Sequence, residues 1–391
     1  MKLAIKLAFR NLIGAGLRTW LNVIVLSFSF VVIIWMKGIL VGWDRQAKSD
    51  MIHWEIGGGQ YWNKNYYPFD PFTLQDAHEA IPAELKAEIA AGGMEPVLIA
   101  QGTIYPEGRM QSVLIKGINP SQSILYLPSQ KLDTLTGAIP AIIGSQMARA
   151  SSLKTGDYVT LRWRDVNGTF DAADICIVDI FTTNVPTVDV AQLWIALDSL
   201  QSMLQMPGEA TLFTFLDPGR ERVKLENWKL MTVEDLVADL EAMIKAKTVG
   251  QSVFYVILLL LALLAIFDTQ VLSIFRRQKE IGTYIALGYT RREVVGLFTV
   301  EGAMYSILAA IVAAAYGIPF LIWQAKKGWS LPLDSGDFGF AMASTLYPVY
   351  SVGLVLTTIS IVLLTTTVVS YLPSRKIAKM NPTEALRGKL Q

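Results

Sequence analysis

The chain has 391 residues, of which 52% are hydrophobic and 17% charged, and its formal net charge is +1. A charged fraction below the roughly 25% of soluble domains argues against a wholly soluble protein and indicates a membrane protein with a substantial soluble part. The single cysteine, Cys176, excludes an intrachain disulfide.

Four apolar stretches are each long enough to cross a bilayer as a helix, which takes about 20 residues. They run from about Leu17 to Val41, Ser252 to Phe275, Val294 to Trp323 and Tyr347 to Leu372. A signal peptide is the alternative for the first stretch, because basic residues precede it. However, it lies far from the N-terminus and no small-x-small cleavage site follows at Gly38–Asp44.

Basic residues gather at one end of the predicted spans. They are Lys2, Lys6, Arg10 and Arg18 before the first span, Arg276, Arg277, Lys279, Arg291 and Arg292 between the second and third, and Arg375, Lys376, Lys379, Arg387 and Lys389 after the fourth. The only acids there are Glu280, Glu293 and Glu384. Since cytoplasmic loops carry the Lys and Arg excess, we expect both termini and the middle loop in the cytoplasm, and residues 43–249 and 324–346 outside.

Aromatic residues cluster near the end of the first span and just after it. They are Trp35, Trp43, Trp54, Tyr61, Trp62, Tyr66 and Tyr67. They fit either an aromatic belt at the outer membrane interface or a hydrophobic loop that packs on its own domain.

The long segment between the first two spans predicts an α+β domain over residues 44–231. Two hairpins are expected: Pro96–Ile104 with Ser112–Ile118, and Tyr158–Trp163 with Ala173–Phe181. Their turn signals are Pro106-Glu107-Gly108 and Asn167-Gly168. Ala210–Leu216 is a further strand candidate, and helical periodicity appears at Leu74–Ala91, Ser145–Ser151 and Asp198–Leu204.

An amphipathic segment, Thr232–Lys247, leads into the second span, and Thr232 with Asp235 suits its N-terminal cap. We therefore predict a stalk helix over 232–251 that continues into the membrane, with Gly250 as its weak point. An ordinary domain helix is the alternative.

Motifs for enzymatic chemistry are absent from the sequence. There is no G-x-x-x-x-G-K-[ST] phosphate loop. His53 and His78, the only histidines, lack metal-ligand spacing with each other or with Cys176. We expect a non-catalytic chain without metal or cofactor.

The loop between the second and third spans predicts a short amphipathic helix over Lys279–Leu287, which Gly288 ends. Its apolar side would consist of Ile281, Tyr284, Ile285 and Leu287. Thr290 and Glu293 then form a capping box that starts the third span. Such a helix suits docking into a groove of a partner, and a simple interfacial helix is the alternative.

The segment RRQKEIGTYIALGYTRREV, the following Glu301-Gly302 and the closing SRKIAKMNPTEALRG resemble the pattern of FtsX-like permeases. In the closing segment the likeness lies in Asn381, Pro382, Ala385, Leu386 and Arg387. The N-terminal AFRNLIGAGLRTWLN, with Arg10, Asn11 and Arg18, is similar to the family's first helix. VLIKGINP and IIGSQMARASSLKTGDYVTL, with Gly156-Asp157, resemble the MacB-like periplasmic core. The chain thus resembles the FtsX-like/MacB-like permeases of type VII ABC transporters over nearly its whole length.

This resemblance implies a membrane α-helical permease with four transmembrane helices and a MacB-like periplasmic core. It implies a dimer with a second permease subunit, the same or different, bound to two copies of a cytoplasmic ABC ATPase subunit. The ATPase-coupling residues would be Lys279, Glu280, Ile281, Gly282, Tyr284, Ile285, Leu287 and Gly288. The expected domains are 1–43 (cytoplasmic N-terminal helix and first span), 44–231 (periplasmic), 232–251 (stalk) and 252–391 (FtsX-like permease domain with coupling helix 279–287).

The chain begins almost at once with its N-terminal helix rather than an ATPase, so the resemblance implies a lipoprotein-releasing permease of the bacterial inner membrane. An unfused MacB-like efflux permease for drugs, peptides or lipids, a regulator of a periplasmic hydrolase and a scaffold without ATPase are alternatives. A periplasmic carrier, adaptor or hydrolase and membrane lipid are expected partners, and nucleic acid is not. The loop Arg164–Thr169 is short for a carrier-recruiting hook.

Two acids lie within the spans, Asp268 in the second and Glu301 in the third. We expect both to face the protein interior, because an acid facing lipid is costly. The hydroxyls of Thr365, Thr366 and Thr367 or a basic residue are the expected partners of Asp268. Small residues at Gly302, Ser306, Ala309, Ala313 and Gly317 predict close helix packing.

Overall fold

The computed structural model describes residues 17–134, 137–220, 222–330, 343 and 345–379. The chain divides into two compact units: a helical unit (residues 1–42, 244–329 and 346–391) and a barrel domain (43–243 and 330–345). Arg10, Asn11 and the closing residues Asn381, Pro382, Ala385, Leu386 and Arg387 lie outside the described residues.

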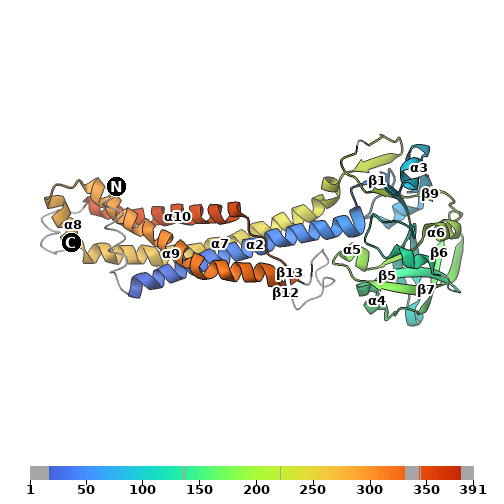
Figure 1. Ribbon diagram of the computed structural model, residues 1–391, viewed down its shortest axis with the longest axis horizontal. Coiled ribbons are helices and arrows are strands. Elements are labelled where there is room, and N and C mark those ends of the chain that lie inside the picture. Colours follow the sequence, from blue (N-terminus) through green and yellow to red (C-terminus); the bar gives the residue numbers. More distant parts are fainter. Residues whose placement is uncertain (1–16, 135–136, 221, 331–342, 344, 380–391) are drawn as a thin grey trace. The chain divides into compact units, whose positions relative to one another are not determined.

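Four described helices are long and apolar enough to cross a membrane, in agreement with the four predicted stretches. They are α2 (Leu17–Met51), α7 (Val233–Arg276), α9 (Arg291–Lys327) and α10 (Val352–Ser374) (Figure 1). Helices α2 and α7 extend well beyond their apolar stretches, and α7 is unbroken at Gly250. Its start is capped as predicted, since the Asp235 N–H donates to Thr232 Oγ1 at 3.2 Å.

The core of the helical unit joins all four helices. Its buried side chains are Val23, Leu26, Phe30 and Val31 of α2, Ala262 and Ile266 of α7, Tyr305, Ala309 and Ala313 of α9, and Val362 of α10. Two glycines of α9 sit at close approaches. A Cβ at Gly302 would lie 2.2 Å from Ser370 Oγ, and one at Gly317 would lie 2.6 Å from Val31 Cγ2. Neither position leaves room for a side chain, so the predicted role of these residues in packing is confirmed.

The centre of the barrel domain is a closed ring of six strands. In order around the ring these are β3 (Met94–Ile104), β4 (Gln111–Ile118), β8 (Gln192–Ala196), β5 (Ile139–Gly144), β7 (Phe170–Phe181) and β6 (Tyr158–Arg164). β3 and β6 close the ring, with Thr103 opposite Arg162. The pairs β4–β8 and β5–β7 are parallel and the other pairs are antiparallel. Both predicted hairpins, β3–β4 and β6–β7, are confirmed.

Alternation along the strands fills the barrel. On β6, Val159, Leu161 and Trp163 point inward and are buried, whereas Thr160 and Arg162 are exposed, as the period of two requires. The same interior includes Leu98, Val113, Ile143, Ile175 and Ile195 from the other five strands.

Shorter elements surround the barrel. The first part of β3 continues into a sheet with β10 (Leu212–Phe215), β1 (Gln60–Asn63) and β11 (Trp228–Met231), and β2 (Glu79–Ala80) pairs with β9 (Glu209–Ala210). The helices are α3 (Ala83–Ala90), α4 (Ser145–Ser151), α5 (Pro186–Asp189) and α6 (Leu197–Leu204). A π-helical turn, Ile52–Ile56, follows α2, and 3₁₀ turns cover Pro71–Gln75, Pro106–Gly108, Ser129–Asp133 and Arg375–Lys379. Trp329–Ser330 and Thr345–Leu346 form a small pair, β12–β13.

The predicted helix Leu74–Ala91 is wrong over its first half, where a 3₁₀ turn and β2 take its place. Pro82 explains the difference, because proline disfavours helical backbone at the residue before it and is tolerated only near a helix start. Ile81 accordingly donates its N–H to the Gly208 carbonyl at 3.0 Å. Only α3, which begins after Pro82, is helical.

The aromatic cluster near the end of the first span packs largely on its own domain. Trp54 stacks on Phe181 with ring centres 5.6 Å apart, and Trp62 lies 5.1 Å from Tyr66. These tryptophans rest against a buried apolar cluster outside the barrel ring. Of the two interpretations, packing on the domain therefore describes Trp54, Trp62 and Tyr66.

Glu95 makes the stability of the barrel domain depend on pH. It is buried on β3, and burial raises the pKa of its carboxyl from an ordinary 4.5 to about 7. The folded state therefore holds its proton more tightly than the unfolded state. Stability from this group is full below pH about 4.5 and is lost as pH rises to about 7, by up to about 3 kcal/mol. Glu95→Gln, which keeps an acceptor for the Asn119 N–H, should remove this slope.

The thiol of Cys176, buried on β7, provides the measurement. Its labelling rate in the full-length protein reports opening of the barrel, and the ratio of wild type to Glu95→Gln at each pH cancels the pH dependence of the thiol chemistry. A ratio that stays constant between pH 4.5 and 7 would contradict the prediction.

Candidate functional site

The candidate site is the corner between α7 and α9. Helix α7 ends at Arg276, the short helix α8 covers Gln278–Ala286, and α9 begins at Arg291. Gly288 ends α8 with a φ of +97°, a backbone region that favours glycine.

The start of α9 is fixed by a capping box. The Thr290 N–H donates to Glu293 Oε2 at 2.8 Å, and the Glu293 N–H donates to Thr290 Oγ1 at 3.3 Å. The capping box predicted from the sequence is confirmed, and it fixes where the chain turns back into the third long helix.

The apolar side of α8 faces this chain's own helices. Ile281 is completely buried and packs with Ile274 of α7, with Val294, Val295 and Phe298 of α9, and with Ile377. Tyr284 and Ile285 are partly buried against the same cluster, and Gly282 is buried. In this chain Ile281 therefore attaches α8 to α7 and α9, and its contact with a partner stays a prediction.

The exposed side of the corner differs from the predicted one. Lys279 and Glu280 are exposed. Leu287 is 72% exposed and Tyr289 45% exposed. An apolar pair at the C-terminal end of α8, rather than Ile281, is thus accessible in this chain.

Arg277 is the residue that the sequence analysis missed. It precedes α8 and donates from Nη1 to both Glu301 carboxylate oxygens at 2.9 and 2.8 Å. Its Nε donates to Glu280 Oε2 at 2.7 Å, and its guanidinium lies 4.8 Å from the centre of the Phe298 ring. Glu301 is buried, as predicted, and its partner is this arginine.

Asp268 lies on an exposed face of α7 in this chain, so the single chain does not enclose it as expected. Ile266 and Gln270, four residues apart, take the interior face of that helix, and Asp268 is half a turn from each. The hydroxyls of Thr365, Thr366 and Thr367 donate to carbonyls of their own helix.

A polar contact between α2 and α7 involves a residue that the sequence analysis did not single out. The Asn22 amide donates to the hydroxyl of Thr269 and, at 3.4 Å, to the Ala265 carbonyl. Together with the Arg277–Glu301 pair, it joins helices of this unit through polar groups.

Comparison with known proteins places the corner inside a matched region. Residues 252–382 match the family described as FtsX-like permease C-terminal. The chain is 26% identical over 176 residues to an uncharacterized ABC transporter permease of Methanocaldococcus jannaschii, covering 42% of this chain and 38% of that protein. It is 27% identical over 130 residues to the macrolide export ATP-binding/permease protein MacB of Bdellovibrio bacteriovorus, covering 32% of this chain and 17% of that protein. The matches thus span well under half of either relative's length.

Proposed function

We propose that this chain, an FtsX/MacB-like ABC transporter permease, passes ATP-driven motion from a separate cytoplasmic ATPase to its barrel domain. The corner α7–α8–α9 would be the part that the ATPase moves. The observation that carries the proposal is the attachment of α8 to α9 through the buried Ile281 and the Arg277–Glu301 ion pair.

A helix held in this way cannot shift without moving its neighbours. The apolar cluster joins α8 to α7 and α9 from one side, and Arg277 joins the start of α8 to the carboxylate of Glu301, in the third turn of α9. Since packed interiors transmit strain, a displacement of α8 by a partner would reach both long helices.

Helix α7 is the proposed route onward. It runs unbroken from Val233, which belongs to the barrel domain, to Arg276 at the corner. In that domain, Lys48 of α2 contacts Glu241 of α7 at 2.7 Å, which ties the extensions of the two helices together. The predicted stalk over 232–251 would move with both.

The proposed orientation of the chain in the membrane rests on its basic residues. Arg276, Arg277, Lys279, Arg291 and Arg292 gather at the corner, which favours a cytoplasmic position for α8 and an extracytoplasmic one for the barrel domain. In this proposal both termini are cytoplasmic, the membrane is the bacterial inner membrane, and two permease subunits bind two ATPase subunits.

For the cargo, we propose lipoprotein release or export first, from the resemblance to lipoprotein-releasing permeases. The loop between β6 and β7 is short and tied down by the bond from the Thr169 N–H to Asp165 Oδ1 at 2.8 Å, so a carrier would be recruited by the other permease subunit. The name of the Bdellovibrio relative, macrolide export, favours small-molecule efflux as the second candidate.

Leu287→Asp tests the coupling proposal. Leu287 is 72% exposed, so the change should leave the fold intact. Burial of a leucine side chain in a groove of the ATPase stabilises a complex by roughly 1.5–3 kcal/mol. The change should therefore weaken ATPase binding by at least about tenfold. Co-purification of the ATPase from native membranes and ATP turnover of the complex are the measurements.

Leu216→Asp is the matched control, because Leu216 is a 58% exposed leucine in the barrel domain. It should leave both readouts unchanged. If Leu287→Asp retains the ATPase and full turnover, or if the wild-type protein never carries an ATPase, the coupling proposal fails in favour of a scaffold.

A further inference from the structure

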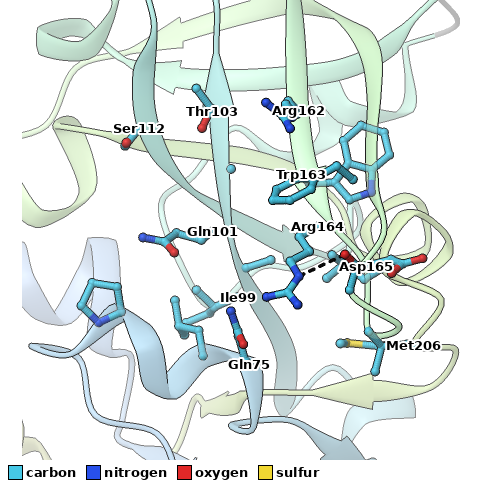
Figure 2. Close-up of a pocket in the computed structure, with 18 of the residues that line it drawn as sticks. Gln75, Ile99, Gln101, Thr103, Ser112, Arg162, Trp163, Arg164, Asp165 and Met206 are labelled. Carbon is cyan, nitrogen blue, oxygen red and sulfur yellow. Dashed lines mark hydrogen bonds between the residues drawn. The ribbon is translucent and has the colours of Figure 1, made fainter.

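The barrel domain has a cavity of about 470 Å³ on the outer face of β3, β4 and β6 (Figure 2). Thr103 of β3 lies opposite Ser112 of β4 and opposite Arg162 of β6, so these three side chains form one row across the strands. Gln101 lies two residues before Thr103 and Arg164 two residues after Arg162, so both share this face. The cavity is thus built on strands of the closed ring.

Two arginines contribute the positive charge of the cavity. The guanidinium of Arg162 lies 4.4 Å from the centre of the Phe170 ring, and Arg164 Nε donates to the Gly168 carbonyl at 3.2 Å. Among the residues that the structure describes, neither arginine forms an ion pair. Since a guanidinium has five N–H donors, both retain donors for a ligand.

The other polar groups select against a phosphate. Asp76 and Asp165 also line the cavity. Asp165 is already bound by the Thr169 N–H at 2.8 Å and the Gln205 amide at 3.1 Å, whereas no described side chain bonds the carboxylate of Asp76. Two acids beside two arginines disfavour a dianion but suit a ligand with one carboxylate and several N–H donors.

The glutamine amides and the apolar side chains that line the cavity also suit a peptide ligand. Figure 2 shows Gln75, Gln101 and Arg164 around the same space, and each glutamine amide can both donate to and accept from a peptide unit. Met110 and Phe170, 73% and 61% exposed, offer apolar contacts beside them. The volume lies within the roughly 300–1,000 Å³ range of small-ligand pockets.

We propose that this cavity binds a short peptide through its free C-terminal carboxylate. Arg162 and Arg164 hold the carboxylate, Gln75 and Gln101 bond the peptide units, and Asp76 accepts an N–H. Arginine pairs with carboxylates through parallel hydrogen bonds that lysine cannot reproduce. Binding requires only the barrel domain's own residues and does not depend on coupling to an ATPase.

The test uses the full-length protein in detergent without any ATPase. The probes are a pool of N-acetylated tripeptides with free carboxylates, the same pool as C-terminal amides, and inorganic phosphate. Equilibrium dialysis with mass spectrometry measures binding. We expect saturable binding from the acid pool, and a loss on the order of 10- to 100-fold for the amide pool and for Arg164→Gln, because charge-assisted hydrogen bonds are removed.

Arg220→Gln is the matched control, since Arg220 is an exposed arginine of the same domain outside the cavity, and it should bind the acid pool like wild type. Protection of the Cys176 thiol checks that each variant is folded. The proposal is overturned if the acid pool does not bind, if acids and amides bind equally, if folded Arg164→Gln binds like wild type, or if equimolar phosphate displaces the peptides.

Discussion

Arg277→Ala should destabilise the helical unit by about 3 kcal/mol, because it leaves the buried carboxylate of Glu301 without its half-buried partner. Glu301 is only 7% exposed, and the two bonds from Arg277 Nη1 are the hydrogen bonds that its carboxylate makes in the described part of the chain. Without them the carboxylate of Glu301 stays buried without a charged partner. The helical unit should therefore open more readily at the junction of α8 and α9.

Thermal unfolding of the full-length protein in detergent measures this loss. Glu301→Gln in the Arg277→Ala background should recover much of it, because the variant then buries a neutral amide instead of a charge. Arg276→Ala is the control, since Arg276 is the exposed neighbour of Arg277 and surface changes usually stay within about 0.5 kcal/mol. Equal melting of Arg277→Ala and Arg276→Ala, or no recovery with Glu301→Gln, would show that the ion pair does not hold α8.

Local signals predicted the local geometry of the site. Gly288 and the spacing of Thr290 and Glu293 lie within a few residues of the structure that they determine, so the end of α8 and the start of α9 could be read from the sequence. The two hairpins of the barrel were likewise predicted from short turns flanked by strand-like segments.

Contacts between residues that are far apart in the chain have no such short motif in the sequence. The parallel pairs β4–β8 and β5–β7 and the closure of β3 on β6 join segments that are far apart in the chain. No turn between them fixes their register, so the sequence analysis reached an α+β domain but not a closed barrel. Arg277 and Glu301 are 24 residues apart, and the arginine was therefore counted only among the basic residues.

The rotation of a helix about its axis decides which neighbours two of the predicted site residues, Ile281 and Asp268, meet in this chain. Periodicity shows that Ile281, Tyr284 and Ile285 share one side of α8, but it does not tell whether a partner or the same chain covers that side. For Asp268, the cost of exposing an acid to lipid led to the prediction that its side chain faces the protein interior. The face of α7 is instead set by Ile266 and Gln270, whose side chains pack inward half a turn away.

Ile281→Asp should abolish both the folding of the corner and ATPase binding. Ile281 is completely buried among Ile274, Val294 and Phe298, and a carboxylate there would lose its hydration without gaining a partner. The loss should amount to several kcal/mol. Ile281→Val, which keeps the apolar contact, should cost only about 0.5–1.5 kcal/mol and should retain the ATPase.

Comparison with Leu287→Asp separates the two faces of α8. Thermal unfolding in detergent and ATPase co-purification are measured on the same preparations of both variants. Ile281→Asp should lower the melting temperature and lose the ATPase, whereas Leu287→Asp should lose the ATPase at an unchanged melting temperature, because its side chain is exposed. If Ile281→Asp instead melts like wild type and loses only the ATPase, Ile281 itself contacts the partner, and α8 must leave its seat on α9 when the ATPase binds.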